Sequence, residues 1–209
     1  MRKISKLCLY VRLSSSTTGL AALTSVIELE LTVFDLSDEG WGRLTNILKG
    51  LPNLRQLSLE SLFGGGVFAD CISGLSLLTH LTIKNLEDIP HSFVALQNLE
   101  CISFEHVHDM ETMPQLPQSI TKITMKGCCY LTNVLFLSEL VNLDKVCVSF
   151  MESLAWNHIP CSIVPCMQVG AHCKKLQEAD RPVFISPKVC AGCNMSLIGK
   201  ICAFCSFCA

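Results

Sequence analysis

A six-residue phrase of apolar and polar positions recurs along the first two thirds of the chain. Its form is apolar-x-x-apolar-x-apolar, and the copies begin at Ile4, Val26, Leu54, Leu78, Leu99, Ile120 and Leu143. The fourth positions of successive copies are separated by 22, 28, 24, 21, 21 and 23 residues. Because the last two apolar positions alternate with polar ones, each phrase predicts a short strand with one apolar face.

One such strand cannot bury its apolar face alone, so the repetition predicts that successive strands stack. Parallel strands about 4.8 Å apart form a continuous sheet over one shared core. A recurrence at about 20–29 residues with this wording is the leucine-rich-repeat pattern. We therefore predict an α/β fold, a leucine-rich-repeat solenoid (horseshoe) of about seven repeats over residues 1–150. Its parallel β-sheet is expected on the concave face, with short helices or turns on the convex side.

The second repeat is the longest and predicts a true helix on the convex side. Ser37 or Asp38 is suited to cap this helix, and Gly50 and Pro52 are suited to end it. Its apolar stripe consists of Leu44, Ile47, Leu48 and Leu51. Repeats of 21 residues leave room only for turns or a 3₁₀ segment.

The residues on either side of the sixth predicted strand indicate which type of leucine-rich repeat the chain contains. A leucine–proline phrase, Leu116-Pro117, precedes the strand, and Gly127-Cys128 followed by Leu131 comes after it. This pattern resembles the repeats of plant disease-resistance proteins, the nucleotide-binding leucine-rich-repeat receptors, over about residues 4–150. The resemblance implies that Cys128 replaces the asparagine of other repeats and points inward to bind the backbone of the turn.

The resemblance implies a recognition or sensing region that takes part in plant defence. No P-loop and no nucleotide-binding or signalling domain is recognisable, so we expect a fragment of a larger multidomain protein. No polar cap precedes Ile4, so the first repeat would expose its edge, which also favours a fragment. The alternative interpretation is that another domain or subunit covers that edge. Repeat proteins linked to an F-box also carry cysteine at the position of Cys128. The alternative function is therefore a substrate-recruiting subunit of a ubiquitin ligase.

Composition narrows the class of partner. The 209 residues carry 16 lysines and arginines against 18 aspartates and glutamates, and no basic stripe is visible, so nucleic acid is not the expected partner. Although 50% of the residues are hydrophobic, no apolar run of about 18 residues predicts a membrane span. The apolar run from Leu7 to Val11 is too short for a good signal peptide, so we expect a cytoplasmic protein.

Two columns of outward-facing residues are predicted on the concave face. The middle column, mostly small and polar, contains Glu30, Ser58, Thr82, Ser103, Thr124 and Cys147. The column that follows the last apolar position contains Tyr10, Thr32, Glu60, Lys84, Glu105, Lys126 and Ser149. Charge alternates from Glu60 to Lys126, so neighbouring strands would place opposite signs side by side.

This arrangement is open to two interpretations, a ladder that neutralises itself and a surface that recognises a partner. We expect ten residues of these columns to bind a protein without catalysis. They are Glu30, Thr32, Ser58, Glu60, Thr82, Lys84, Ser103, Glu105, Thr124 and Lys126. A further hypothesis is a metal or acid–base cluster of His80, Glu105, His106 and His108. No catalytic constellation is apparent, so we do not expect an enzyme.

The C-terminal quarter changes in character. Residues 151–189 break the register and are expected to form an irregular cap or linker. In residues 190–209, Cys190, Cys193, Cys202 and Cys205 form two Cys-x-x-Cys pairs that resemble a short zinc ribbon. The pairs are separated by eight residues, and four thiolates suit a structural zinc ion. The alternatives are an iron–sulfur site that uses Cys208, palmitoylation, and an end without a role.

Metal analysis tests the zinc hypothesis. A chain purified under reducing conditions is expected to hold one zinc ion, and both Cys190→Ser and Cys205→Ser are expected to lose it because each removes one of four ligands. Iron in place of zinc would favour the iron–sulfur alternative. A chain without metal would leave a repeat scaffold with no zinc module.

Overall fold

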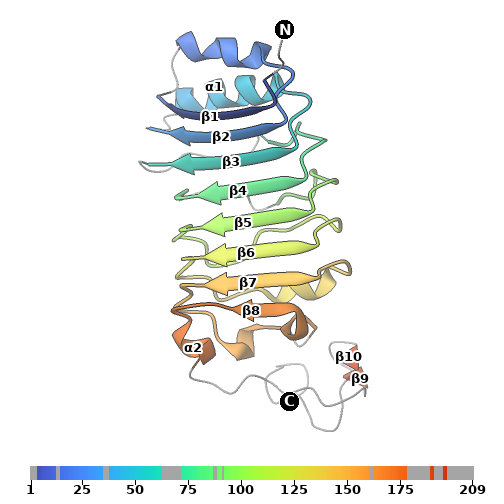
Figure 1. Cartoon of the computed structure of the whole chain (residues 1–209). Helices are drawn as coiled ribbons and strands as arrows, with labels where there is room; N and C mark the ends of the chain where they lie inside the picture. Colours follow the sequence, from blue (N-terminus) through green and yellow to red (C-terminus); the bar gives the residue numbers. More distant parts are fainter. Residues whose placement is uncertain are drawn as a thin grey trace.

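A computed structural model of the chain consists mainly of one parallel sheet (Figure 1). The structure describes residues 4–12, 15–34, 38–62, 72–86, 89–90, 92–160 and 162–177, and it describes the backbone alone at 15–18, 38, 189–190 and 195–196. The strands are β1 (Lys6–Val11), β2 (Glu28–Val33), β3 (Gln56–Ser61), β4 (His80–Lys84), β5 (Cys101–Glu105), β6 (Lys122–Lys126), β7 (Lys145–Ser149) and β8 (Met167–Val169). They lie side by side in chain order, as expected for a leucine-rich-repeat-like solenoid.

The strands pair without any shift in register, so equivalent positions of the repeated phrase stack on one another. One stack runs through Leu29, Leu57, Leu81, Ile102, Ile123 and Val146. The next runs through Leu31, Leu59, Ile83, Phe104, Met125 and Val148. All of these side chains are buried in one core cluster, which confirms the predicted fold class and register.

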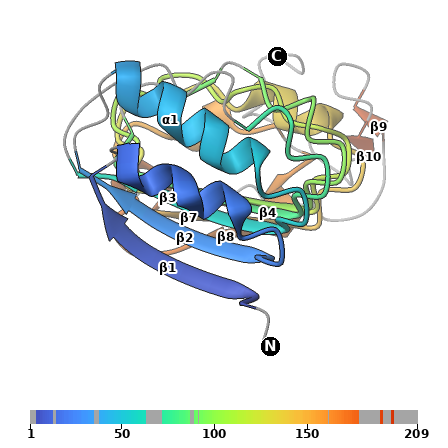
Figure 2. The same ribbon diagram turned by 90° about the horizontal axis from the view of Figure 1, so that it is seen from above.

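The described parts of the segments that connect successive strands cover one face of the sheet (Figure 2). The 3₁₀ helix η1 (Ser15–Ala22) and the helix α1 (Asp38–Lys49) lie together on that face. The predicted stripe of α1 is confirmed, since Leu44, Ile47 and Leu48, and Leu51 just beyond its end, are all buried. From β4 to β6 the described parts of the connections contain turns and no helix, and the 3₁₀ helix η2 (Leu135–Glu139) precedes β7.

Asparagines before three of the strands tie neighbouring repeats together. The side-chain amides of Asn53, Asn98 and Asn142 donate to the backbone carbonyls of Thr24, Ser76 and Gln118 at 2.8, 2.8 and 2.9 Å. Each acceptor lies in the preceding repeat. These bonds satisfy carbonyls that the turns would otherwise leave without a protein partner.

The chain turns sharply after each strand from β4 to β8. The residue that follows, or nearly follows, the strand has a positive φ at Asn85, His106, Gly127, Phe150 and His172. At Gly127 the φ is +68°, and an added Cβ would lie 2.5 Å from His106 Nδ1. Glycine therefore meets both a conformational and a steric requirement at this turn.

Residues 151–177 differ from the irregular cap or linker expected from the sequence. They contain the 3₁₀ helices η3 (Trp156–His158) and η4 (Val164–Cys166), the strand β8 and the short helix α2 (Lys174–Gln177). Val164-Pro-Cys-Met167-Gln-Val169 is itself a copy of the repeated phrase, 21 residues after β7. Trp156 closes this end, with its indole Nε1 donating to the Leu176 carbonyl at 3.0 Å. The prolines in this segment concealed an eighth repeat.

Two findings complete the fold. The backbones of β9 (Val189–Cys190) and β10 (Met195–Ser196) pair antiparallel. Among the residues that the structure describes, no helix has the length and apolar character needed to cross a membrane.

The stacked core predicts the effect of truncating Leu81, which is 1% exposed between Leu57 and Ile102. Leu81→Ala should lower the free energy of unfolding by about 2–5 kcal/mol, because it removes buried methyl groups and leaves a cavity. Urea denaturation measures this change. Val141→Ala is the control, since Val141 is 83% exposed and the loss there should stay below about 0.5 kcal/mol. A loss below about 1 kcal/mol for Leu81→Ala would contradict the observed register.

Candidate protein-binding face

The face of the sheet opposite α1 carries three columns of outward-facing side chains, which together we call the open face. The strand pairing places Cys8, Glu30, Ser58, Thr82, Ser103, Thr124, Cys147 and Gln168 in its middle column. The exit column, at the end of the strands, contains Tyr10, Thr32, Glu60, Lys84, Glu105, Lys126 and Ser149. The structure thus brings the ten predicted partner-binding residues together in two adjacent columns.

A third column was missed in the sequence. This entry column, at the beginning of the strands, contains Lys6, Glu28, Gln56, His80, Cys101, Lys122 and Lys145. Its members lie two residues before the middle column, on the same face of the strand. Extending the period-two alternation by one more step would have found them.

Thr32 does not form part of the accessible surface. It is only 3% exposed, although its neighbours in the exit column are accessible. Its hydroxyl donates to a Glu60 carboxylate oxygen at 3.2 Å, and the Asn85 side-chain amide donates to the other oxygen at 3.0 Å. Thr32 therefore helps to position Glu60, and its own contact with a partner would be small.

The alternating charges of the exit column are only weakly paired. Lys84 Nζ lies 3.8 Å from Glu105 Oε2, and both side chains are more than a quarter exposed. Among the described residues, no ion pair joins Glu60 to Lys84 or Glu105 to Lys126. An exposed pair at this distance contributes about 0–1 kcal/mol. Self-neutralisation therefore accounts for little of the charge in the exit column.

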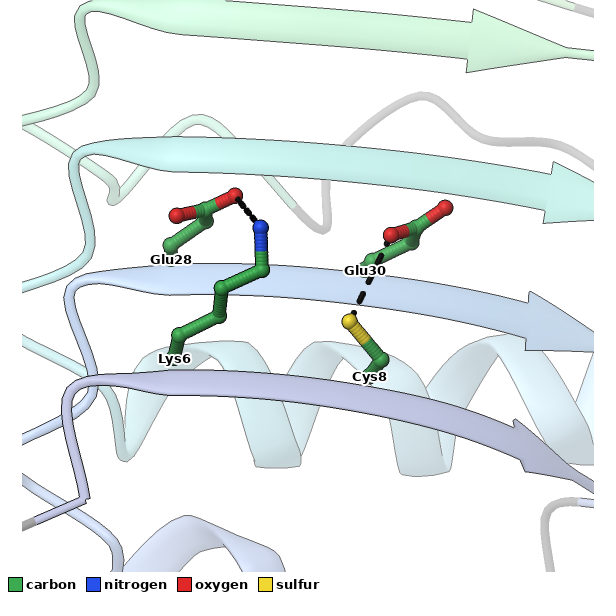
Figure 3. A network of polar contacts seen from close by, with 4 residues as sticks. All are labelled: Lys6, Cys8, Glu28 and Glu30. Carbon is green, nitrogen blue, oxygen red and sulfur yellow. Dashed lines mark hydrogen bonds and ion pairs between the residues drawn. The ribbon is translucent and has the colours of Figure 1, made fainter.

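The open face is hollowed over β2, β3 and β4. A hollow of about 210 Å³ is lined by Glu28, Leu29, Glu30, Gln56, Leu57, Ser58, His80 and Thr82. Two of its lining residues are carboxylates with close polar partners: Lys6 Nζ donates to Glu28 at 2.5 Å, and Cys8 Sγ donates to Glu30 at 3.4 Å (Figure 3). These hydrogen bonds are the main reason that the pKa values of Lys6 and Cys8 are raised. Two carboxylates and one ammonium thus leave this hollow with an excess of negative charge.

Cys128 lies on the other side of the sheet and has a structural role. Its side chain is buried, and its Sγ is 3.8 Å from the Phe104 carbonyl and 3.9 Å from the Lys126 carbonyl. Burial raises the pKa of this thiol to about 11. Cys128 therefore points inward toward the backbone as the resemblance implied, and it stays protonated at neutral pH.

The two metal hypotheses have different outcomes. His106 and His108 have ring centroids 6.0 Å apart, but no group of three or more His, Cys, Asp or Glu side chains suited to a metal ion occurs in the described ranges. Cys193, Cys202 and Cys205 lie outside those ranges, and only the backbone of Cys190 is described. Zinc binding by the tail therefore stays a prediction.

The chain matches no protein-family model, and no curated protein matches it significantly in sequence.

The raised pKa of Cys128 predicts a loss of stability at alkaline pH. Between the ordinary value of 9.0 and the folded value of about 11, the unfolded chain releases this proton and the folded chain keeps it. The free energy of unfolding should therefore fall as pH rises through this range, by up to about 2–3 kcal/mol. Urea titrations measure the free energy of unfolding at pH 8 and at about pH 11. Its decline between these two pH values should be smaller for Cys128→Ala than for the unsubstituted chain. Equal declines in the two proteins would contradict the assignment.

Proposed function

We propose that this chain is a non-catalytic protein-binding module and that the open face is its binding surface. The observation that carries the proposal is the uninterrupted middle column, in which Ser58, Thr82, Ser103 and Thr124 follow one another in register. Small polar side chains let the backbone of a partner approach the sheet closely. The longer charged side chains of the two outer columns then flank that partner.

The dimensions of the open face fit a protein partner. Seven strand spacings of about 4.8 Å give a length of roughly 34 Å, and five residues per strand give a width of roughly 16 Å. With the relief of the side chains, this area approaches the roughly 800 Å² that each partner buries in a typical specific complex. A small-molecule site would instead be a closed, mostly apolar pocket.

The resemblance to plant disease-resistance receptors extends the proposal to a sensing role in defence. The inward position of Cys128, beside the Phe104 and Lys126 carbonyls, agrees with this relationship and equally with the F-box-linked alternative. A cytoplasmic location is part of the proposal. The cysteines whose side chains the structure describes are free thiols, as expected in a reducing compartment.

Site-specific photo-cross-linking tests this function. A photoreactive amino acid replaces Ser103 on the open face, and the control carries it at Val141, which is exposed in the turn before β7. In extracts of cells that express the protein, discrete protein adducts are expected from position 103 and not from position 141. Ser103→Arg introduced together with a probe at Thr82 should suppress the adduct, because a long side chain blocks close approach.

The result that contradicts the proposal is equally defined. If positions 82 and 103 give no more adduct than position 141 while the variants remain folded by circular dichroism, the open face is not the binding surface. A recovered ubiquitin-ligase component would favour the ligase alternative over the defence role.

A further inference from the structure

Charge on the open face is sorted along the solenoid. On β1–β3 the three columns carry Lys6, Glu28, Glu30 and Glu60, a net charge of −2. On β4 and β5 they carry Lys84 and Glu105, which cancel. On β6 and β7 they carry Lys122, Lys126 and Lys145, a net charge of +3. The face therefore has an acidic end, a neutral centre and a basic end.

The basic end costs the isolated chain stability. Lys122 and Lys145 are register partners on adjacent strands, so two ammonium groups of like charge project side by side. Like charges directly opposite each other in a sheet are destabilising. Within the described part of the chain, no carboxylate forms an ion pair with either lysine or with Lys126. An anionic group placed over β6 and β7 would relieve this repulsion.

The acidic end has both charge and shape. The hollow over β2–β4 has Glu28 and Glu30 on one side and the amide and hydroxyls of Gln56, Ser58 and Thr82 on the other. Such a hollow fits the ammonium or guanidinium of a lysine or arginine side chain, because carboxylates and hydroxyls accept hydrogen bonds from it. Glu60 adds a further negative charge beside it on β3.

Charged residues at the entry edge reduce the charge difference between the two ends and remove the difference between the acidic end and the centre. Arg55, Glu100 and Asp144 immediately precede β3, β5 and β7 and lie outside the three columns. With them included, the net charges become −1, −1 and +2 from the acidic to the basic end. The carboxylates and ammonium groups that project from the strands themselves keep the full separation.

Resting on the proposed function, we propose that the partner is an extended polypeptide segment with segregated charge. The segment lies along the solenoid with lysine or arginine over the hollow at β2–β3 and aspartate or glutamate over β6–β7. Four strand spacings separate β2 from β6, or about 19 Å. An extended chain covers that distance in roughly six residues, and the small middle column leaves room for its backbone.

Two synthetic peptides of identical composition test the charge order. The segregated peptide is Lys-Arg-Ser-Thr-Ser-Thr-Ser-Thr-Glu-Glu, and the interleaved peptide is Lys-Glu-Ser-Thr-Ser-Thr-Ser-Thr-Arg-Glu, both with blocked ends. Titration of the ¹⁵N-labelled full chain, followed by NMR at low salt, gives the affinity and the strands that are perturbed. The segregated peptide should bind at least about 10-fold tighter, because both of its ends are bound at once. It should perturb β2–β3 and β6–β7 together.

Charge reversal at each end gives matched variants. Glu30→Lys at the acidic end and Lys122→Glu at the basic end should each weaken the segregated peptide about 10-fold or more and bring it close to the interleaved one. Glu139→Lys and Lys174→Glu make the same changes on exposed side chains outside the open face and should leave the affinity unchanged. The NMR spectrum of each variant reports whether it is folded.

Two outcomes would overturn this inference. One is equal binding of the two peptides, or no effect of Glu30→Lys and Lys122→Glu. If the photoreactive amino acid at position 103 still cross-links to a protein in that case, the protein-binding function stands and only the charge order is wrong. The other is a stable dimer in sedimentation that either reversal dissociates, because a second copy of the chain would then be the occupant. If the peptides bind equally and position 103 also gives no protein adduct, the proposed protein-binding function itself is wrong.

Discussion

Burial of the apolar face of each strand against its neighbours is the interaction on which this molecule depends. A five-residue strand such as β4 has Leu81 and Ile83 as its only inward side chains, too few to form a core. Stacked in register between β3 and β5, the same two residues become fully enclosed. Because every strand relies on the next in this way, a shift of one residue would expose the apolar side chains of a whole strand.

This constraint on the inner face also fixes the outer one. When Leu57, Leu81 and Ile102 must stack, the residues that alternate with them stack as well, and this produces the three columns of the open face. The outer residues contribute little to burial, so their identity is free to vary with a partner. That freedom makes it informative that they carry opposite charge at the two ends, including the side-by-side pair Lys122 and Lys145.

The sequence predicted those features that a repeated pattern determines. Periodicity placed seven strands, their register, α1 and two columns of the open face, because equivalent positions must coincide in a solenoid. The predicted solenoid ends at residue 150 and does not include the eighth repeat, because Pro165 lies inside the phrase of that repeat and interrupts its strand pattern. In the structure Pro165 lies in η4, before β8 begins, and so it removes no hydrogen bond from the sheet.

The repeated apolar and polar pattern of the sequence does not predict individual side-chain contacts. Charge alternation in the exit column suggested a continuous ladder, but Glu60 accepts hydrogen bonds from Thr32 and Asn85 and forms no ion pair with Lys84 in the described structure. The outcome depends on the left-handed turn at Asn85, which brings its amide back toward β3. The periodic part of the sequence therefore determines where side chains lie, and the turns determine which of them remain available to a partner.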